Sequence, residues 1–237
     1  MDAETSGTGV LRVTGTVAVV TGGAGAVGLA SAKLLARDHH VVLSDSRGER
    51  LSRALDELDS LGVSAESIVA DVTDRASVEA LMLAARQAGP IASVVHAGGG
   101  ATADASPEDI VRARVLGTMN VTAATLAVAG LGTTLVHASA HSPALVLPAL
   151  PRWVFRLAPT DPEGLVTALT RLATLGPARR APAAAHALST SFLQWYAGRM
   201  SETFDACGAR LRSTAAESVI DLCRADLAAT PTRSAVA

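Results

Sequence analysis

Lysine, tyrosine and cysteine are scarce in this sequence of 237 residues, which has only Lys33, Tyr196, Cys207 and Cys223 of these types. Two isolated cysteines form neither a disulfide framework nor a cysteine-rich metal site, so we expect ordinary thiols in a reducing compartment. The histidines also lack close pairs with ligand spacing and accompanying carboxylates. We therefore predict no metal site.

Long apolar runs and an excess of one charge are also missing. The 20 basic and 22 acidic residues nearly balance, and the basic residues are scattered, which argues against a nucleic-acid-binding surface. No stretch is apolar enough to span a bilayer, and residues 1–12 lack the pattern of a signal peptide. We expect a cytoplasmic protein that binds neither nucleic acid nor membranes, with residues 1–12 as a flexible tail.

The sequence does contain a glycine-rich loop between an apolar run and an amphipathic segment. Residues 17–20 are apolar, residues 21–28 read Thr-Gly-Gly-Ala-Gly-Ala-Val-Gly, and a helical pattern follows over 29–37. In this order, glycines let the backbone approach a pyrophosphate, which then meets the free N–H groups of the helix start. We predict a dinucleotide-binding loop made of Thr21, Gly22, Gly23, Gly25, Val27 and Gly28.

A second apolar run, residues 41–45, ends in Asp45. Its separation from the loop is about that of the carboxylate that hydrogen-bonds the ribose hydroxyls of NAD. Because this carboxylate would repel a 2′-phosphate, we predict NAD as the cofactor, with NADP less favoured. The nearby Arg47 favours NADP instead. Ser46 joins Asp45 in the predicted ribose site, and also has capping-box spacing to Glu49.

Further strands are predicted over 67–70, 91–97 and 133–139, with helices between them; one of these helices begins at Ser106-Pro107. This alternation predicts an α/β fold, a doubly wound, Rossmann-like parallel sheet with helices on both faces, in a single domain over 13–237. Gly98 and Gly99 follow the fourth strand at the edge where such sheets bind ligands. We expect both to contact the cofactor.

Four patterns together resemble the short-chain dehydrogenase/reductase family: Thr21-Gly22-x-x-x-Ala26-x-Gly28, Asp71-Val72, Ala97-Gly98, and Val115-Leu116-Gly117-Thr118 with Asn120-Val121. In that family the loop binds the pyrophosphate, the acidic residue after the second strand holds the adenosine ribose, and the Asp-Val pair borders the adenine. The resemblance implies the adenine role for Asp71 and Val72, and adds Ala97 to the cofactor contacts. Ala26 stands where the family usually has glycine.

The catalytic residues of the family are not matched. The family uses a serine after the fifth strand, and a tyrosine four residues before a lysine that lowers its pKa and holds the nicotinamide ribose. Lys33 lies in the first predicted helix, so no such pair exists. Residues 185–190 resemble the family's Tyr-x-x-Ser-Lys segment, with His186 for tyrosine and Thr190 for lysine.

The remaining catalytic positions are altered as well. Ala140 stands at the serine position with Ser139 beside it, and Arg114 replaces the catalytic asparagine. Imidazole, with a pKa near 6.5, is matched to proton transfer at neutral pH, whereas phenol, near 10, needs a neighbouring cation. We predict a rebuilt acid/base site of His186, His141, Ser139 and Arg114. His96 and His137 lie nearby, where each alone is expected to be structural.

Residues 142–184 form a proline-rich insert with a helical stretch over 163–175, which is read as a lid over the cleft or a surface excursion. Residues 208–213 resemble the family's sixth strand. An alternative alignment with the family places this strand at Trp153 to Pro159 instead. The part that follows is expected to be reduced relative to the family.

Two functions remain open. The first is an enzyme that acts on a small hydroxyl or carbonyl compound, by hydride transfer with NAD or by a non-redox elimination, isomerisation or cyclisation. The second is an inactive relative that binds nucleotide or stabilises a partner. We expect a homo-oligomer in the first case and a hetero-oligomer in the second.

Overall fold

Six parallel strands form the centre of the protein, in the order β3-β2-β1-β4-β5-β6. The computed structural model describes residues 15–98, 105–139, 152–215 and 218–219. The strands are β1 (Thr16–Thr21), β2 (His39–Asp45), β3 (Ala65–Val69), β4 (Ile91–His96), β5 (Thr134–Ser139) and β6 (Arg210–Ala215).

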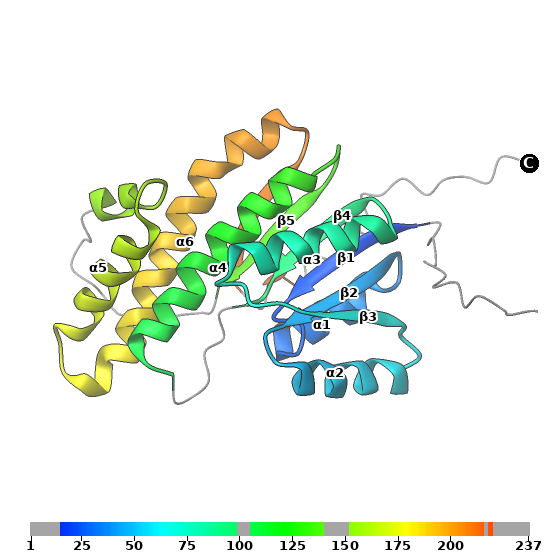
Figure 1. Ribbon diagram of the computed structural model, residues 1–237, viewed down its shortest axis with the longest axis horizontal. Coiled ribbons are helices and arrows are strands. Elements are labelled where there is room, and N and C mark those ends of the chain that lie inside the picture. Colours follow the sequence, from blue (N-terminus) through cyan, green and yellow to red (C-terminus); the bar gives the residue numbers. More distant parts are fainter. Residues whose placement is uncertain (1–14, 99–104, 140–151, 216–217, 220–237) are drawn as a thin grey trace, which may run out of the picture.

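Helices cover both faces of this sheet (Figure 1). They are α1 (Ala26–Leu35), α2 (Gly48–Ser60), α3 (Arg75–Ala88), α4 (Pro107–Val128), α5 (Pro162–Thr174) and α6 (Ala181–Ala206), with short 3₁₀ turns η1 (Arg152–Leu157) and η2 (Ala178–Arg180). Alternate residues of β1 face opposite sides: Ala18 and Val20 pack with α1 and α2, and Val17 and Val19 with α3, α4 and α6. The predicted doubly wound fold is confirmed.

The strand order reverses between β1 and β4, which are neighbours at the centre of the sheet. From this point the chain winds outward in both directions, so the helices diverge above the strand ends. The backbone N–H of Ala97 donates to the carbonyl of Thr21 at 3.0 Å, which ties the two strand ends together. Open α/β sheets bind ligands at such a reversal.

The described part of the insert forms a third layer. η1 and α5 pack on the side of α4 and α6 that faces away from the sheet (Figure 1). This second core includes Phe155 of η1, Leu165 and Leu169 of α5, and Phe192 of α6, all buried. On its rim, Arg112 of α4 forms a double hydrogen bond with Glu163 of α5, both at 2.8 Å. The described insert is therefore a packed layer, and not a surface excursion.

The sixth strand lies where the resemblance of residues 208–213 predicted it. β6 pairs in parallel with β5, from Thr134 opposite Arg210 to Ser139 opposite Ala215. The alternative strand at Trp153 to Pro159 is wrong, because most of this segment forms the turn η1 and buries Val154, Phe155 and Ala158 in the second core.

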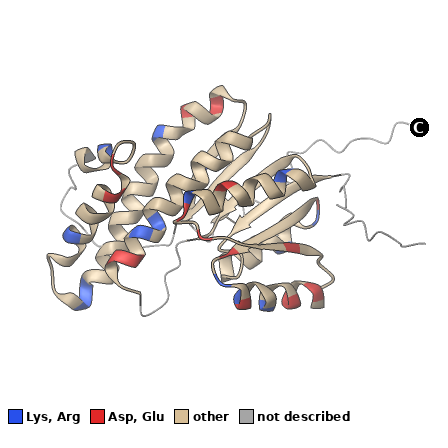
Figure 2. Cartoon of the chain, in the orientation of Figure 1, with Lys and Arg blue, Asp and Glu red and all other residues tan. Residues whose placement is uncertain are grey.

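Charged residues of both signs alternate on the exposed helices, most visibly along α2 (Figure 2). No described helix is long and apolar enough to cross a membrane. The described residues do not include Gly99, His141, the predicted tail over 1–12 or the residues from 220 onward.

Candidate functional site

A pocket opens at the carboxyl ends of β1 to β4, where the strand order reverses. Eight of the residues predicted to bind the cofactor line it: Gly22, Gly25, Asp45, Ser46, Asp71, Val72, Ala97 and Gly98. Sequence spacing and the family resemblance together thus located most of this pocket. They missed Arg50, Ala70, Thr73 and Ala113, which also line the pocket.

The glycine loop closes tightly against the end of β4. Gly22 has φ +67°, and a Cβ atom there would lie 2.7 Å from the backbone N of Gly98. A Cβ on Gly28 would collide with the carbonyl oxygen of Gly22. Gly25 is the N-cap of α1 and supplies no side-chain cap. Because a helix begins with N–H groups that lack intrahelical partners, this start suits an anion such as a pyrophosphate.

Other loop residues shape the pocket without lining it. The hydroxyl of Thr21 is buried and hydrogen-bonded to Nδ1 of His96, 2.7 Å away. A Cβ on Gly23 would lie 2.6 Å from the side chain of Leu43. Val27 packs against the core between the sheet and α1. These three residues therefore hold the loop in place from the side of the protein core.

Asp45 lies at the end of β2 with 7% of its side chain exposed. Its Oδ1 accepts from the backbone N–H of Arg47 at 3.3 Å and lies 3.7 Å from Nη1 of Arg50. Arg50 also donates to the carbonyl of Ala24 in the glycine loop at 3.3 Å. The lining of the pocket therefore includes Asp45 and two arginines, Arg47 and Arg50. Ser46 does not cap α2, because this helix begins at Gly48 with Arg47 as its N-cap.

The loop after β3 is held by hydrogen bonds. Oδ1 of Asp71 accepts from the backbone N–H and the hydroxyl of Thr73, both at 2.8 Å. Asn120 of α4 donates to the carbonyls of Val72 and Thr73 at 2.9 and 3.1 Å. These bonds fix the wall of the pocket where the sequence placed the adenine.

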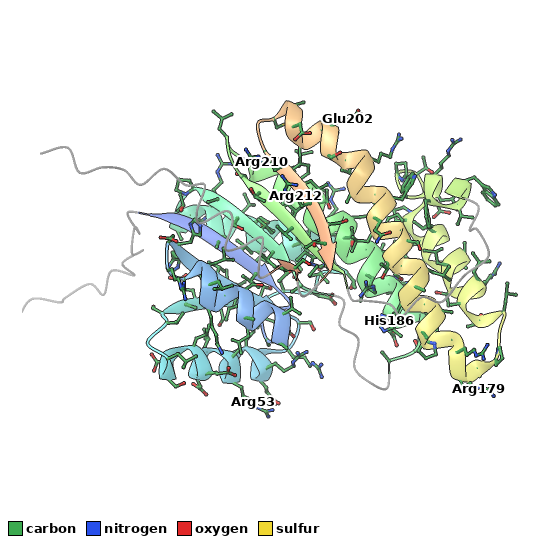
Figure 3. The ribbon with its side chains drawn as sticks, turned by 180° about the vertical axis from the view of Figure 1, so that it is seen from behind. Arg53, Arg179, His186, Glu202, Arg210 and Arg212 are labelled. Atoms are coloured by element: carbon green, nitrogen blue, oxygen red, sulfur yellow. The ribbon has the colours of Figure 1, made fainter. Side chains whose placement is uncertain are left out.

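A second group of polar residues lies between α4 and α6. Arg114 of α4 donates from Nη2 to the hydroxyl of Thr190 of α6 at 3.0 Å. His186 lies one helical turn before Thr190, on the same side of α6. Figure 3 shows His186 on the part of α6 near the strand ends. Thr190, which resemblance placed at the family's lysine position, is thus hydrogen-bonded to Arg114, the residue at its asparagine position.

Burial controls the charge of these groups. The pKa of His186 lies below its usual value, first because of burial and second because of the positive charge of Arg114. Nδ1 of His186 is buried and has no hydrogen-bond partner among the described residues. Burial also lowers the pKa of Arg114; a guanidinium nevertheless stays protonated. The site therefore presents a neutral imidazole beside a cation.

His96 and His137 have structural roles. Both are buried, and their rings meet edge to face with centroids 5.3 Å apart. Nε2 of His137 is hydrogen-bonded to the hydroxyl of Thr122 at 2.8 Å. Ser139 ends β5. Among the residues described, no three histidine, cysteine or carboxylate side chains gather to hold a metal ion.

The sequence matches one family model over residues 16–142, which is described as short chain dehydrogenase. A putative ketoacyl reductase of monensin polyketide synthase from Streptomyces virginiae is 36% identical over 129 residues, which are 51% of this chain and 49% of that protein. A putative ketoacyl reductase from Streptomyces coelicolor is 35% identical over 124 residues, 48% of each. The chain matches about half the length of these relatives.

Solved structures share the fold. The actinorhodin polyketide ketoreductase with NADPH superposes with a TM-score of 0.58 at 22% identity, over 85% of this chain and 69% of that one. A short chain dehydrogenase from Mycobacterium smegmatis gives a TM-score of 0.59 at 21% identity, over 92% and 82% of the chains. Since the family match ends at residue 142, it includes Arg114 but not His186 or Thr190.

Proposed function

The chain belongs to the short chain dehydrogenase family, and from this premise we propose that it binds a nicotinamide dinucleotide and interconverts a hydroxyl and a carbonyl group, with His186 as the acid/base. The observation that carries the proposal is His186 itself, a half-buried, neutral imidazole that resemblance places at the family's tyrosine position.

The pocket has features that would suit a dinucleotide. Gly22 and Gly28 let the loop pack closely against the end of β4 and against itself, and the uncapped start of α1 would supply N–H groups for the pyrophosphate. Asp45 and Ser46 would hold the adenosine ribose, and Val72 would border the adenine. The nicotinamide, when bound, accepts or donates the hydride.

His186 supplies the proton transfer. When an alcohol is oxidised, a hydride leaves its carbon and the hydroxyl proton passes to the neutral imidazole; in the reverse direction the imidazolium returns that proton to the new alkoxide oxygen. Because burial and Arg114 disfavour the charged form of His186, the imidazolium is a stronger acid than in water. This chemistry needs no lysine to lower a phenol pKa.

We propose NAD rather than NADP as the cofactor because the carboxylate of Asp45 lies in the ribose pocket. Arg47 and Arg50 moderate this preference, since Arg50 partly neutralises Asp45. Titrations of NADH and NADPH should give tighter binding of NADH, and Asp45→Asn should narrow the difference. Tighter NADPH binding by the unmodified chain would reverse the assignment.

The main test replaces His186. His186→Ala should lower the reduction of acetoacetate or its methyl ester by NADH by about a hundredfold or more, the usual worth of a general acid/base, and leave the NADH dissociation constant within about twofold of the unmodified value. Ser191→Ala, one turn further along α6, is the matched control, because its hydroxyl bonds only to the Ala187 carbonyl of its own helix.

Labelled cofactor separates the remaining alternatives. Deuterium at the hydride position of NADH should appear at the new alcohol carbon of the product. A product without deuterium would mean a non-redox reaction. NADH binding with no product from any carbonyl or hydroxyl substrate would favour the inactive, nucleotide-binding relative.

A further inference from the structure

Two arginines of α4 have opposite environments. Arg112 lies at the rim, partly exposed, and meets two carboxylates, those of Glu163 at 2.8 Å and Glu108 at 3.7 Å. Arg114 has only 5% of its surface exposed. Among the described residues, no carboxylate lies within ion-pair distance of Arg114. The buried cation is thus the one without an anion.

We propose that Arg114, together with Thr190, binds a carboxylate group of the substrate. The substrates of the proposed oxidoreductase would then be hydroxy and oxo carboxylic acids. This inference rests on the proposed function only in placing the carboxylate and the reacting carbon in the same site.

The hydrogen bonds of Arg114 leave donors unused for such a ligand. One bond, from Nη2 to the hydroxyl of Thr190, is formed at 3.0 Å. Nε is buried and has no partner among the residues that the structure describes. Guanidinium N–H groups form a planar fork that matches the two oxygens of a carboxylate. The hydroxyl of Thr190 orients this fork.

The burial of Arg114 favours the binding of an anion. An ion removed from water is strongly destabilised unless an opposite charge accompanies it, and one hydrogen bond to a neutral hydroxyl does not replace that charge. A carboxylate would supply it, whereas a ribose hydroxyl would not. This difference favours an anionic substrate over a lysine-like contact of Arg114 with the nicotinamide ribose.

The charged neighbours agree with this assignment. Among the described residues, the charge of Arg114 lowers the pKa of His96 from β4 and of His186 from α6, in both cases after burial. Neither brings a competing anion. His186 is four residues before Thr190 on α6, so a carboxylate on Arg114 would place the adjoining carbons of the substrate near the acid/base.

The test compares acids with their neutral esters. Pyruvate, acetoacetate and levulinate, each with its methyl ester, are titrated calorimetrically into the full chain, with and without NAD. At least one acid should bind tenfold or more tightly than its ester. Equal binding of every acid and its ester would overturn the proposal.

Variants then assign the preference to Arg114. Arg114→Gln should remove the preference for the acid and leave ester and NADH binding unchanged, Arg114→Lys should retain part of it, and Arg112→Gln is the exposed control that should retain all of it. An Arg114→Gln variant that keeps the preference, or that loses NADH affinity instead, contradicts the proposal. If Arg114→Gln does not fold, Thr190→Val serves in its place and should weaken acid binding alone.

Turnover separates this inference from the proposed function. His186→Ala should lose turnover and keep the preference for the acid. A chain that binds acids through Arg114 but reduces none of them would refute the proposed oxidoreductase and leave the carboxylate site standing.

Discussion

His96 shows how a polar residue at a strand end can serve packing. α4 approaches the ring of His96 closely at Gly117, where a Cβ would lie 3.4 Å from the imidazole. Nδ1 of His96 is hydrogen-bonded to Thr21. Burial, followed by the charge of Arg114, lowers the pKa of His96 to about 3. The native protein therefore holds this histidine neutral across the physiological range.

This pKa has a consequence for stability. Between pH 6.5, near the pKa of an unfolded histidine, and about 3, the unfolded chain binds a proton that native His96 does not. The free energy of unfolding therefore falls with falling pH in this window, by up to about 1.4 kcal/mol per pH unit for this group, and is unaffected above it.

His96→Asn should reduce that slope. Urea unfolding of the variant and of the unmodified chain, measured from neutral pH down to pH 4, gives the comparison. Identical slopes for the His96→Asn variant and the unmodified chain would show that His96 titrates normally in the native state.

Individual site residues were predictable only where local sequence order determines them. The glycine loop and Asp45 follow from short-range spacing, and three of these residues, Gly22, Gly25 and Asp45, line one pocket. Arg50 was missed, although it lies only five residues beyond Asp45. The bond between Arg114 and Thr190 could not be predicted, because 76 residues separate the two and their contact depends on how α4 and α6 pack.

At the scale of single elements, helix starts illustrate the same limit. Ser106 caps α4 with a complete capping box to Asp109, as its neighbour Pro107 indicated, and Asp74 caps α3. Ser46 has the spacing of a capping box to Glu49 but does not form one. Ser46 lines the pocket at the end of β2, where Asp45 accepts from the backbone N–H of Arg47. The spacing is the same in both segments, and the tertiary position decides whether a cap forms.

The cap of α4 should be measurable. Ser106→Ala removes acceptors for the Asp109 N–H and is expected to lower the free energy of unfolding by about 1 kcal/mol. Ser52→Ala is the matched control: its hydroxyl bonds only to the Gly48 carbonyl within exposed α2, so we expect a change within about 0.5 kcal/mol. Denaturant midpoints for both variants would check this, and equal losses would count against the capping box.

For the molecule as a whole, the doubly wound sheet was predictable because each strand and helix carries its own pattern. The third layer was not. α4 and α6 bury residues toward the sheet and toward α5, so neither helix has the single apolar stripe that would reveal a further partner. The apolar residues of the insert do not predict the layer by themselves either, because their packing depends on the faces of α4 and α6 that they contact.

Phe155 tests whether this layer unfolds with the sheet. Phe155→Ala should lower the free energy of unfolding by about 3–5 kcal/mol, because the ring is buried against Phe192 and Trp195. Trp153→Ala, two residues away and 65% exposed, should cost far less. Unfolding followed by tryptophan fluorescence and by far-ultraviolet circular dichroism should coincide for the unmodified chain; separate transitions would mean that the layer is an independent unit.

The double burial of α4 and α6 also bears on how such a site can be exchanged between relatives. A chimaera that received only α6, with His186 and Thr190, would lack the arginine of α4 and would expose the apolar side that α5 covers here. A chimaera that received α4 alone would place a buried cation against a foreign helix. The smallest transferable unit is therefore α4, α5 and α6 together with η1, so that recombination would move Arg114, His186 and Thr190 and their scaffold as one block.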